Sequence, residues 1–183
     1  RELATPGNAL VYFDGFVFDN MDYTGGVGYS GLTIGCSNYN TIRRNEFKNF
    51  SNTTSENNNY GMLKAMCVDT QYYNNVIQDN KLHDFSGGNA IGSLYHQSKM
   101  LIENNHIYNA LGQGSGPSHN GISPKTDVRD FTVRGNKIVM ANGWIAGYNN
   151  SDMKQNIEFN YNLFVNTGSS RMGVLMNWNV GQG

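Results

Sequence analysis

The stretch LIENNHIYNA (residues 101–110) decides the fold, because its pattern recurs along the chain. Its anchor is Asn105, with Ile102 three positions before it and Ile107 two positions after it. A recurring motif at intervals of about 20–50 residues indicates a solenoid or a related repeat architecture. Four further segments repeat this arrangement of apolar–x–x–Asn–x–apolar: TIRRNEFKNF (41–50), VIQDNKLHDF (76–85), TVRGNKIVMA (132–141) and EFNYNLFVNT (158–167).

The anchors Asn45, Asn80, Asn105, Asn136 and Asn162 follow one another at unequal intervals, so the loops vary while the motif persists. Two short strands meeting at a bend explain the motif, because alternation along each strand turns the flanking apolar residues toward one interior. Asn suits the bend, since it tolerates left-handed backbone and its amide can bond the equivalent amide one rung away. We therefore predict an all-β chain forming a single domain over residues 1–183, a right-handed single-stranded parallel β-helix of about six to seven rungs.

The composition agrees with this fold class and excludes several others. The 183 residues include 22 Gly and 28 Asn, which disfavour helices, and 38% hydrophobic residues with 11 Tyr and 9 Phe, which disfavour disorder. A net charge of −1 lacks the basic excess of a nucleic-acid-binding protein. The chain contains no long uninterrupted apolar run, so we expect no membrane span.

The repeat resembles that of the pectate-lyase-like superfamily of right-handed parallel β-helices, over nearly the whole chain. ALVYFDGFVFDN (9–20) is similar to an opening coil, and MGVLMNWNVG (172–181) to one more strand at the far end. The terminal segments are too short to cap a solenoid. We expect the chain to be part of a longer protein, or its ends to be covered by a partner, which includes the option of a homo-oligomer.

A candidate site follows from a second set of strands that precede the anchors. In sugar-processing members of the superfamily, stacked strands of this kind form the substrate groove. Aligning Ile91, Ile122 and Ile145 as equivalent inward residues places Leu94, Lys125 and Tyr148 at equivalent positions three residues later. The resulting patch contains Asp69, Tyr95, His96, Lys125, Tyr148 and Trp178.

Lys125 is the candidate general base, since desolvation readily lowers the pKa of a lysine. NGISPKTDVRDFTVRGNKI (120–138) resembles the region that carries the lysine base of alginate lyases and chondroitinase B. The resemblance implies β-elimination on an acidic polysaccharide with Lys125 as the base. Tyr95, Tyr148 or His96 of the patch is the candidate acid or orienting group, and His119 and Arg129 are substrate-binding candidates. The family places an Arg on the next strand, whereas GWIAGY (143–148) has none. The alternative for Lys125 is a solvated turn lysine.

His119-Asn-Gly-Ile-Ser also stands where polygalacturonases carry acidic residues, so a hydrolase with two carboxylates is not expected. His83 and His106 fall at outward positions and are expected to be solvated. Cys36 and Cys67 are far apart in the sequence and are expected to be buried thiols. The scattered carboxylates support no calcium site and no other cofactor.

Two functional hypotheses remain open from the sequence. The first is a carbohydrate-active enzyme, a lyase acting on a uronate-containing polysaccharide. The second is a non-enzymatic β-helix, such as a tail-fibre or tailspike segment or a surface adhesin, that binds a cell-surface glycan or is purely structural. Both imply an extracellular, virion-surface or cell-surface location.

Overall fold

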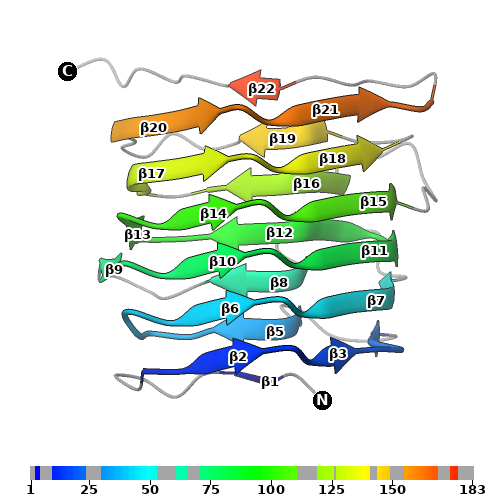
Figure 1. The fold of residues 1–183 in the computed structure, drawn as a ribbon, viewed down its shortest axis with the longest axis horizontal. Coiled ribbons are helices and arrows are strands. Elements are labelled where there is room, and N and C mark those ends of the chain that lie inside the picture. The colour runs from blue at the N-terminus through cyan, green and yellow to red at the C-terminus, as the bar shows by residue number, and fades with distance from the viewer. Residues whose placement is uncertain are drawn as a thin grey trace.

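The computed structural model describes residues 3–4, 10–23, 30–52, 61–65, 71–110, 119–125, 127–140, 144–148, 155–168 and 174–176. The described residues contain strands and no helix, and each pair of neighbouring strands is parallel. The strands form three sheets that stack turn upon turn (Figure 1). The predicted parallel β-solenoid is therefore confirmed.

We call the three sheets A, B and C. Sheet A has seven strands: β1 (Leu3–Ala4), β5 (Ser30–Ile34), β8 (Gly61–Ala65), β12 (Gly88–Leu94), β16 (His119–Pro124), β19 (Trp144–Tyr148) and β22 (Val174–Met176). Sheet B has eight: β2 (Tyr12–Asp14), β6 (Thr41–Arg43), β9 (Tyr72–Tyr73), β10 (Val76–Gln78), β13 (Gln97–Ser98), β14 (Leu101–Glu103), β17 (Arg129–Arg134) and β20 (Gln155–Asn160). Sheet C has seven: β3 (Val17–Phe18), β4 (Asp22–Tyr23), β7 (Glu46–Asn52), β11 (Lys81–Ser86), β15 (His106–Ala110), β18 (Lys137–Met140) and β21 (Leu163–Asn166).

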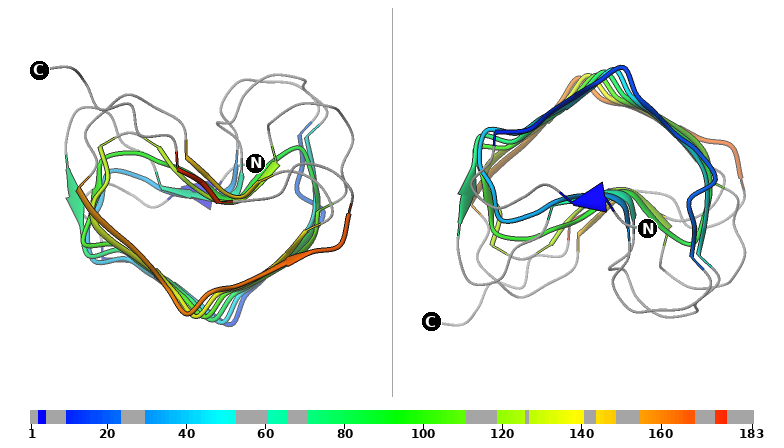
Figure 2. Two further views of the ribbon diagram at one scale, coloured as in Figure 1. Left: turned by 90° about the horizontal axis from the view of Figure 1, so that it is seen from above. Right: turned by 90° about the horizontal axis from the view of Figure 1, so that it is seen from below.

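The winding of the chain is right-handed. In Figure 1 the chain climbs from the N-terminus to the C-terminus, the strands of sheets B and C in front run left to right, and those of sheet A behind run right to left. In cross-section, sheets B and C meet at a sharp corner, and sheet A closes the third side and bends inward toward them (Figure 2). The outer face of sheet A is consequently the concave face of the solenoid.

The apolar residues of the repeat fill the interior as predicted. Ile77 of β10 pairs with Ile42 and Ile102 on the adjacent turns, and all three side chains are fully buried. On the other side of the corner, Leu82 of β11 pairs with Phe47 and Ile107, which are equally buried. Each turn thus contributes one apolar residue from each side of the Asn, and burying them against the next turn supplies the main stabilisation.

The five anchor Asn residues form one continuous ladder along the corner between sheets B and C. Asn80 illustrates the arrangement: its backbone N–H and its Nδ2 both donate to Asn105 Oδ1, at 3.0 and 2.9 Å. Its Nδ2 also donates to the Ile42 carbonyl on the preceding turn, at 2.9 Å. Because a backbone N–H can only donate, the atom that faces it must be Oδ1, so all the amides in the ladder point the same way. The same pair of bonds joins Asn45 to Asn80, Asn105 to Asn136, and Asn136 to Asn162.

The prediction of six to seven rungs was wrong, because the solenoid has about four turns. The turns that begin with β6, β10, β14 and β17 have fully buried apolar side chains along sheets B and C. The strands outside them form terminal layers. The structure describes no further turn beyond these layers, and their inward-facing aromatic residues are only partly buried: Phe13, Phe18, Phe159 and Phe164.

The prediction of buried free thiols was also wrong, because Cys36 is disulfide-bonded and exposed. The chain has one other cysteine, Cys67, which lies outside the described residues. Cys36 and Cys67 are separated in sequence by the same interval as Ile34 and Ala65, which pair on adjacent turns.

Candidate functional site

The outer face of sheet A carries several polar residues that alternate with the core residues. Leu32, Leu63, Ile91 and Ile122 stack in register and are fully buried in the core. By strand alternation, their neighbours Thr33, Lys64, Gly92 and Ser123 occupy the opposite, concave face. Lys64 is 4% exposed and Ser123 is 3% exposed. The concave face thus holds a nearly buried cation, and burying a lysine is costly unless its ammonium has partners.

Lys125 and Tyr95 lie side by side at the end of this face. Lys125 directly follows β16 and Tyr95 directly follows β12, and the Lys125 backbone N–H donates to the Leu94 carbonyl at 3.0 Å. The Lys125 ammonium lies 5.7 Å from the centre of the Tyr95 ring, within cation–π distance. Lys125 is only 6% exposed, so the alternative of a solvated turn lysine is wrong.

Burial shifts the acid–base behaviour of both residues. Desolvation lowers the pKa of Lys125 to about 8, because removing water disfavours the ammonium form. Desolvation raises the pKa of Tyr95, because it disfavours the phenolate. Near neutral pH, a fraction of Lys125 is therefore an uncharged amine that can accept a proton, beside a phenol that can donate one.

A hydrogen-bonded cluster borders this pair at the corner between sheets A and B. His96 Nδ1 lies 3.4 Å from Asp127 Oδ2, and Arg129 Nε donates to Asp127 Oδ1 at 2.8 Å. Gln71 Nε2 donates to the same carboxylate and, at 2.9 Å, to the Asp127 carbonyl. Burial alone would raise the pKa of Asp127, but the hydrogen bonds from Arg129, Gln71 and His96 outweigh it and lower the pKa. Asp127 stays ionised and fixes the orientation of His96 and Arg129.

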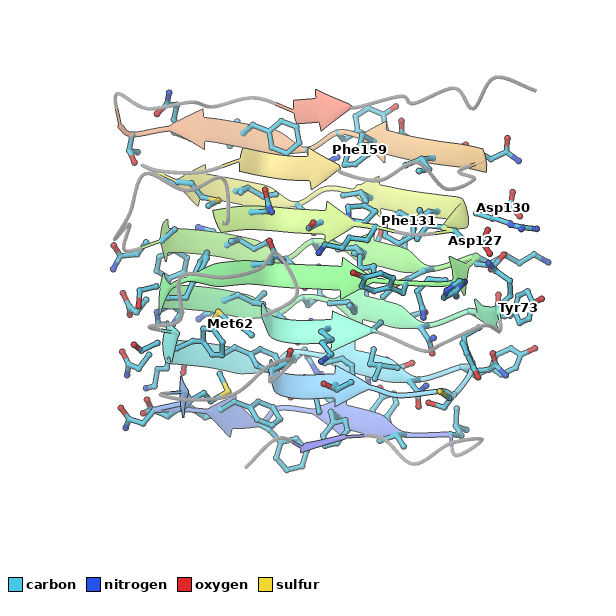
Figure 3. The ribbon with its side chains drawn as sticks, turned by 180° about the vertical axis from the view of Figure 1, so that it is seen from behind. Met62, Tyr73, Asp127, Asp130, Phe131 and Phe159 are labelled. Carbon is cyan, nitrogen blue, oxygen red and sulfur yellow. The ribbon has the colours of Figure 1, made fainter. Side chains whose placement is uncertain are left out.

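Figure 3 shows sheet A from outside, with Asp127, Asp130 and Tyr73 along one edge of the solenoid. Tyr73 is 42% exposed there. The structure thus brings together four of the predicted site residues: Lys125 and Tyr95 on the concave side, and His96 and Arg129 at the adjoining corner.

The other four predicted site residues are placed less fully. Tyr148 and His119 lie in β19 and β16, where the structure describes the backbone but not their side chains. Asp69 and Trp178 lie outside the described residues. Their roles stay predictions.

The alignment used to assemble the patch was off by one residue. Ile122 pairs with Ala146 and not with Ile145, and Leu94 pairs with Pro124 and not with Lys125. The register shifts between Ile91 and Leu94, where β12 contains an irregularity. A one-residue slip exchanges the two faces of a strand, so Tyr148 falls in the register of Pro124 and not beside Lys125.

Three residues of this region were missed by the sequence analysis. Asp127 follows His96 at the same interval by which Asn136 follows Asn105, and Gln71 precedes His96 at the interval by which Asn80 precedes Asn105. Applying the anchor spacings to the corner between sheets A and B would have aligned Gln71, His96 and Asp127. Lys64 alternates with Leu63 and Ala65 along β8, which marks it as an outward residue. Its deep burial had no sequence signal.

The outer face of sheet C is a separate charged surface. Lys81 pairs with Glu46 and with His106, and His106 pairs with Lys137. His83 was predicted to be solvated, and this was wrong: it is 8% exposed and stacks on Tyr108, with ring centroids 4.6 Å apart. Its ring nitrogens lie 2.7 Å from Asp84 Oδ2 and 3.1 Å from Glu46 Oε1, which explains how a polar ring is accommodated there.

Among the residues that the structure describes, no three His, Cys, Asp or Glu side chains come together in a way that could hold a metal ion. The described part of the chain also contains no helix long and apolar enough to cross a membrane. Comparison of the chain with protein families, with curated proteins and with solved structures finds no match. The resemblance to pectate-lyase-like proteins therefore rests on the repeat pattern alone.

Proposed function

We propose that this β-solenoid is a carbohydrate-active protein that binds an acidic, uronate-containing polysaccharide on the concave face of sheet A and cleaves it by β-elimination. The observation that carries this proposal is Lys125, which is buried against Tyr95 and has a pKa lowered to about 8. A lysine of this kind can act as a general base near neutral pH.

The chemistry assigns complementary roles to the two neighbours. The uncharged amine of Lys125 removes the proton from C5 of the uronate, the electron pair forms the C4–C5 double bond, and the bond from C4 to the bridging oxygen breaks. Tyr95, kept protonated by its raised pKa, donates its proton to the departing oxygen. Its position beside Lys125 places acid and base on adjacent turns.

Cations around the pair favour an anionic ligand. Lys64 occupies the same concave face, and Arg129 lies at the adjoining corner. Arg129 uses its Nε to bond Asp127, and its side chain remains 35% exposed. These charges attract uronate carboxylates, and removing a proton next to a carboxylate is easier when its charge is offset.

A second candidate function is glycan binding without turnover, or a purely structural role. The sequence GWIAGY, of which β19 forms residues 144–148, supplies no Arg or His on the strand next to β16. Related lyases use such a residue to neutralise the uronate carboxylate, so its absence favours a non-catalytic solenoid.

The location that we propose is extracellular or on a virion or cell surface. A disulfide-bonded Cys36 supports this, because disulfides persist in oxidising compartments. The partner that we propose is accordingly a polysaccharide or a cell-surface glycan.

The test is a panel of alginate, polygalacturonate and chondroitin sulfate, monitored by the ultraviolet absorbance of the unsaturated product. We expect turnover with at least one polymer, a rate that increases as the pH rises through about 8, and loss of turnover in Lys125→Ala. Lys81→Ala is the matched control, because Lys81 is an exposed lysine on sheet C. Binding measured by calorimetry without turnover would support the second function, and neither binding nor turnover would contradict both glycan proposals.

A further inference from the structure

The two ends of the Asn ladder are chemically different. At each inner step, one Oδ1 accepts both the backbone N–H and the Nδ2–H of the anchor on the preceding turn. Asn162 is the last anchor: its Oδ1 accepts these two bonds from Asn136, and its Nδ2 donates to the Val133 carbonyl at 2.8 Å. Within the described residues, its backbone N–H and its second Nδ2 hydrogen have no acceptor.

The opposite end of the ladder is closed. The position equivalent to the anchor on the first turn is Phe16, whose backbone N–H donates to Asn45 Oδ1 at 2.9 Å. A phenylalanine side chain offers no oxygen to a preceding turn. Since all the amides point the same way, the ladder begins at Phe16 and presents two hydrogen-bond donors at Asn162.

The strands beside Asn162 are also open on one side. Among the described strands, β20 pairs only with β17 and β21 pairs only with β18. Phe159 and Phe164, the apolar residues on either side of this anchor, are half-buried, whereas the equivalent Ile102 and Ile107 are fully buried. An unpaired strand edge with exposed apolar surface is a template for a further strand.

We propose that the Asn162 end of the solenoid is a docking edge for a polypeptide segment with the pattern apolar–x–x–Asn–x–apolar, bound as one more parallel turn. Its Asn oxygen accepts both unpaired donors of Asn162, and its apolar residues cover Phe159 and Phe164. The inner ladder fixes this geometry, because one oxygen accepts two bonds of about 3.0 Å at every step. The inference is independent of any glycan activity.

Because the occupant must supply an Asn oxygen to Asn162, a second copy of the chain stacked end to end is excluded. Such a copy would bring Phe16 to Asn162 and leave both donors buried without an acceptor. A donor that is buried without an acceptor loses its hydrogen bond to water and so opposes the association. The ladder thus discriminates between an Asn-bearing turn and the N-terminal end of the same protein.

The first experiment titrates the protein with a peptide of residues 101–110 and with the same peptide carrying Asn105→Leu. Fluorescence anisotropy reports affinity, and nitrogen-15 amide shifts report whether Asn162 is the contact. We expect the unmodified peptide to shift the Asn162 backbone and side-chain resonances, and the substituted peptide to bind at least tenfold more weakly. Equal affinity of the two peptides, or shifts that avoid Asn162, would overturn the proposal.

The second experiment creates the missing acceptor at the other end. Phe16→Asn places a side-chain oxygen where the ladder lacks one, so we expect the variant to self-associate end to end in analytical ultracentrifugation while the wild type does not. Adding Asn162→Leu to this variant should abolish the association. If the wild type already self-associates in a manner that Asn162→Leu removes, a second copy can occupy this end and the proposed occupant is wrong. If Phe16→Asn has no effect, the ladder does not govern docking.

Discussion

Asn80 and Asn105 are joined by two hydrogen bonds that share one oxygen. Asn105 Oδ1 accepts the Asn80 backbone N–H at 3.0 Å and the Asn80 Nδ2–H at 2.9 Å, although the two residues are distant in sequence. Both side chains are 1% exposed. A side chain thus satisfies a backbone donor at the bend, where the strand ladder is interrupted.

Replacing Asn105 with Ala should lower the free energy of unfolding by about 2–4 kcal/mol, because it leaves the Asn80 N–H and the Ile77 carbonyl unpaired in the interior. Urea denaturation measures this. The matched control is Asn160→Ala, since Asn160 is exposed and its amide makes only a 3.3 Å bond to Glu158. We expect that control to stay within about 0.5 kcal/mol of the wild type. Equal effects of the two changes would contradict the structural role of the ladder.

Ile102→Ala should cost about 2–5 kcal/mol, as a truncation in the middle of a packed core. Ile102 is fully buried between Ile77 and Val133 of the adjacent turns, so the cavity cannot collapse without moving two strands. Leu163→Ala is the control, because Leu163 is 54% exposed. If thermal melts gave the same melting temperature for Ile102→Ala and for the control, the inward assignment of Ile102 would be wrong.

The stability of the protein should rise with pH between about 8 and 9.5 because of Lys125. Its pKa is about 8 in the folded protein against 10.5 for an unperturbed lysine. In this window the unfolded chain retains the proton that the native protein has released, so a higher pH favours the native state. Urea unfolding at pH 7, 8 and 9 measures the slope.

Lys125→Met should flatten that slope, whereas Lys81→Met, at an exposed position of sheet C, should leave it unchanged. A slope that persists in Lys125→Met would assign the titration to another group.

Reducing the disulfide of Cys36 should destabilise the protein. Closing a loop of about 30 residues restricts the unfolded chain by about 3–4 kcal/mol in the chain-entropy description. We expect the melting temperature to fall on addition of dithiothreitol and in Cys36→Ser, and the two treatments together to be no worse than either alone. An additive effect would indicate that the reductant acts elsewhere.

The sequence predicted sheets B and C well because their residues obey local rules. Ile102, Asn105 and Ile107 lie close together in one short segment, so strand alternation fixes the two Ile, and the bonds of the amide to the preceding turn account for Asn105. The expected left-handed backbone at the anchor was wrong, because it falls on the preceding residue, Asn104. The number of turns was overestimated, since the sequence does not distinguish an enclosed turn from a terminal layer such as that of Phe159.

The candidate site could be predicted only in part, because the motif around the anchor Asn marks the register of sheets B and C and not that of sheet A. Register there depends on loops of unequal length and on an irregularity between Ile91 and Leu94. Lys125 and Tyr95 were assigned to the site from the alignment of the strands and, for Lys125, from the resemblance to polysaccharide lyases, but their contact and the burial of Lys125 depend on how successive turns stack. The contact between His96 and Asp127 joins residues on different turns, and only the anchor spacings, carried over to this corner, would have aligned the two positions.

The ladder makes the anchor-to-anchor segment, and not the single residue, the unit by which this protein can change in size. Because Asn80, Asn105 and Asn136 carry the same bonds at unequal sequence intervals, a duplicated or deleted stretch that begins and ends at equivalent positions would leave every remaining amide in phase. The body would lengthen or shorten in steps of about 4.8 Å. Unequal recombination between repeats would therefore yield folded descendants of different lengths, whereas a one-residue insertion between an anchor and its flanking apolar residue would turn that residue to the opposite face of its strand.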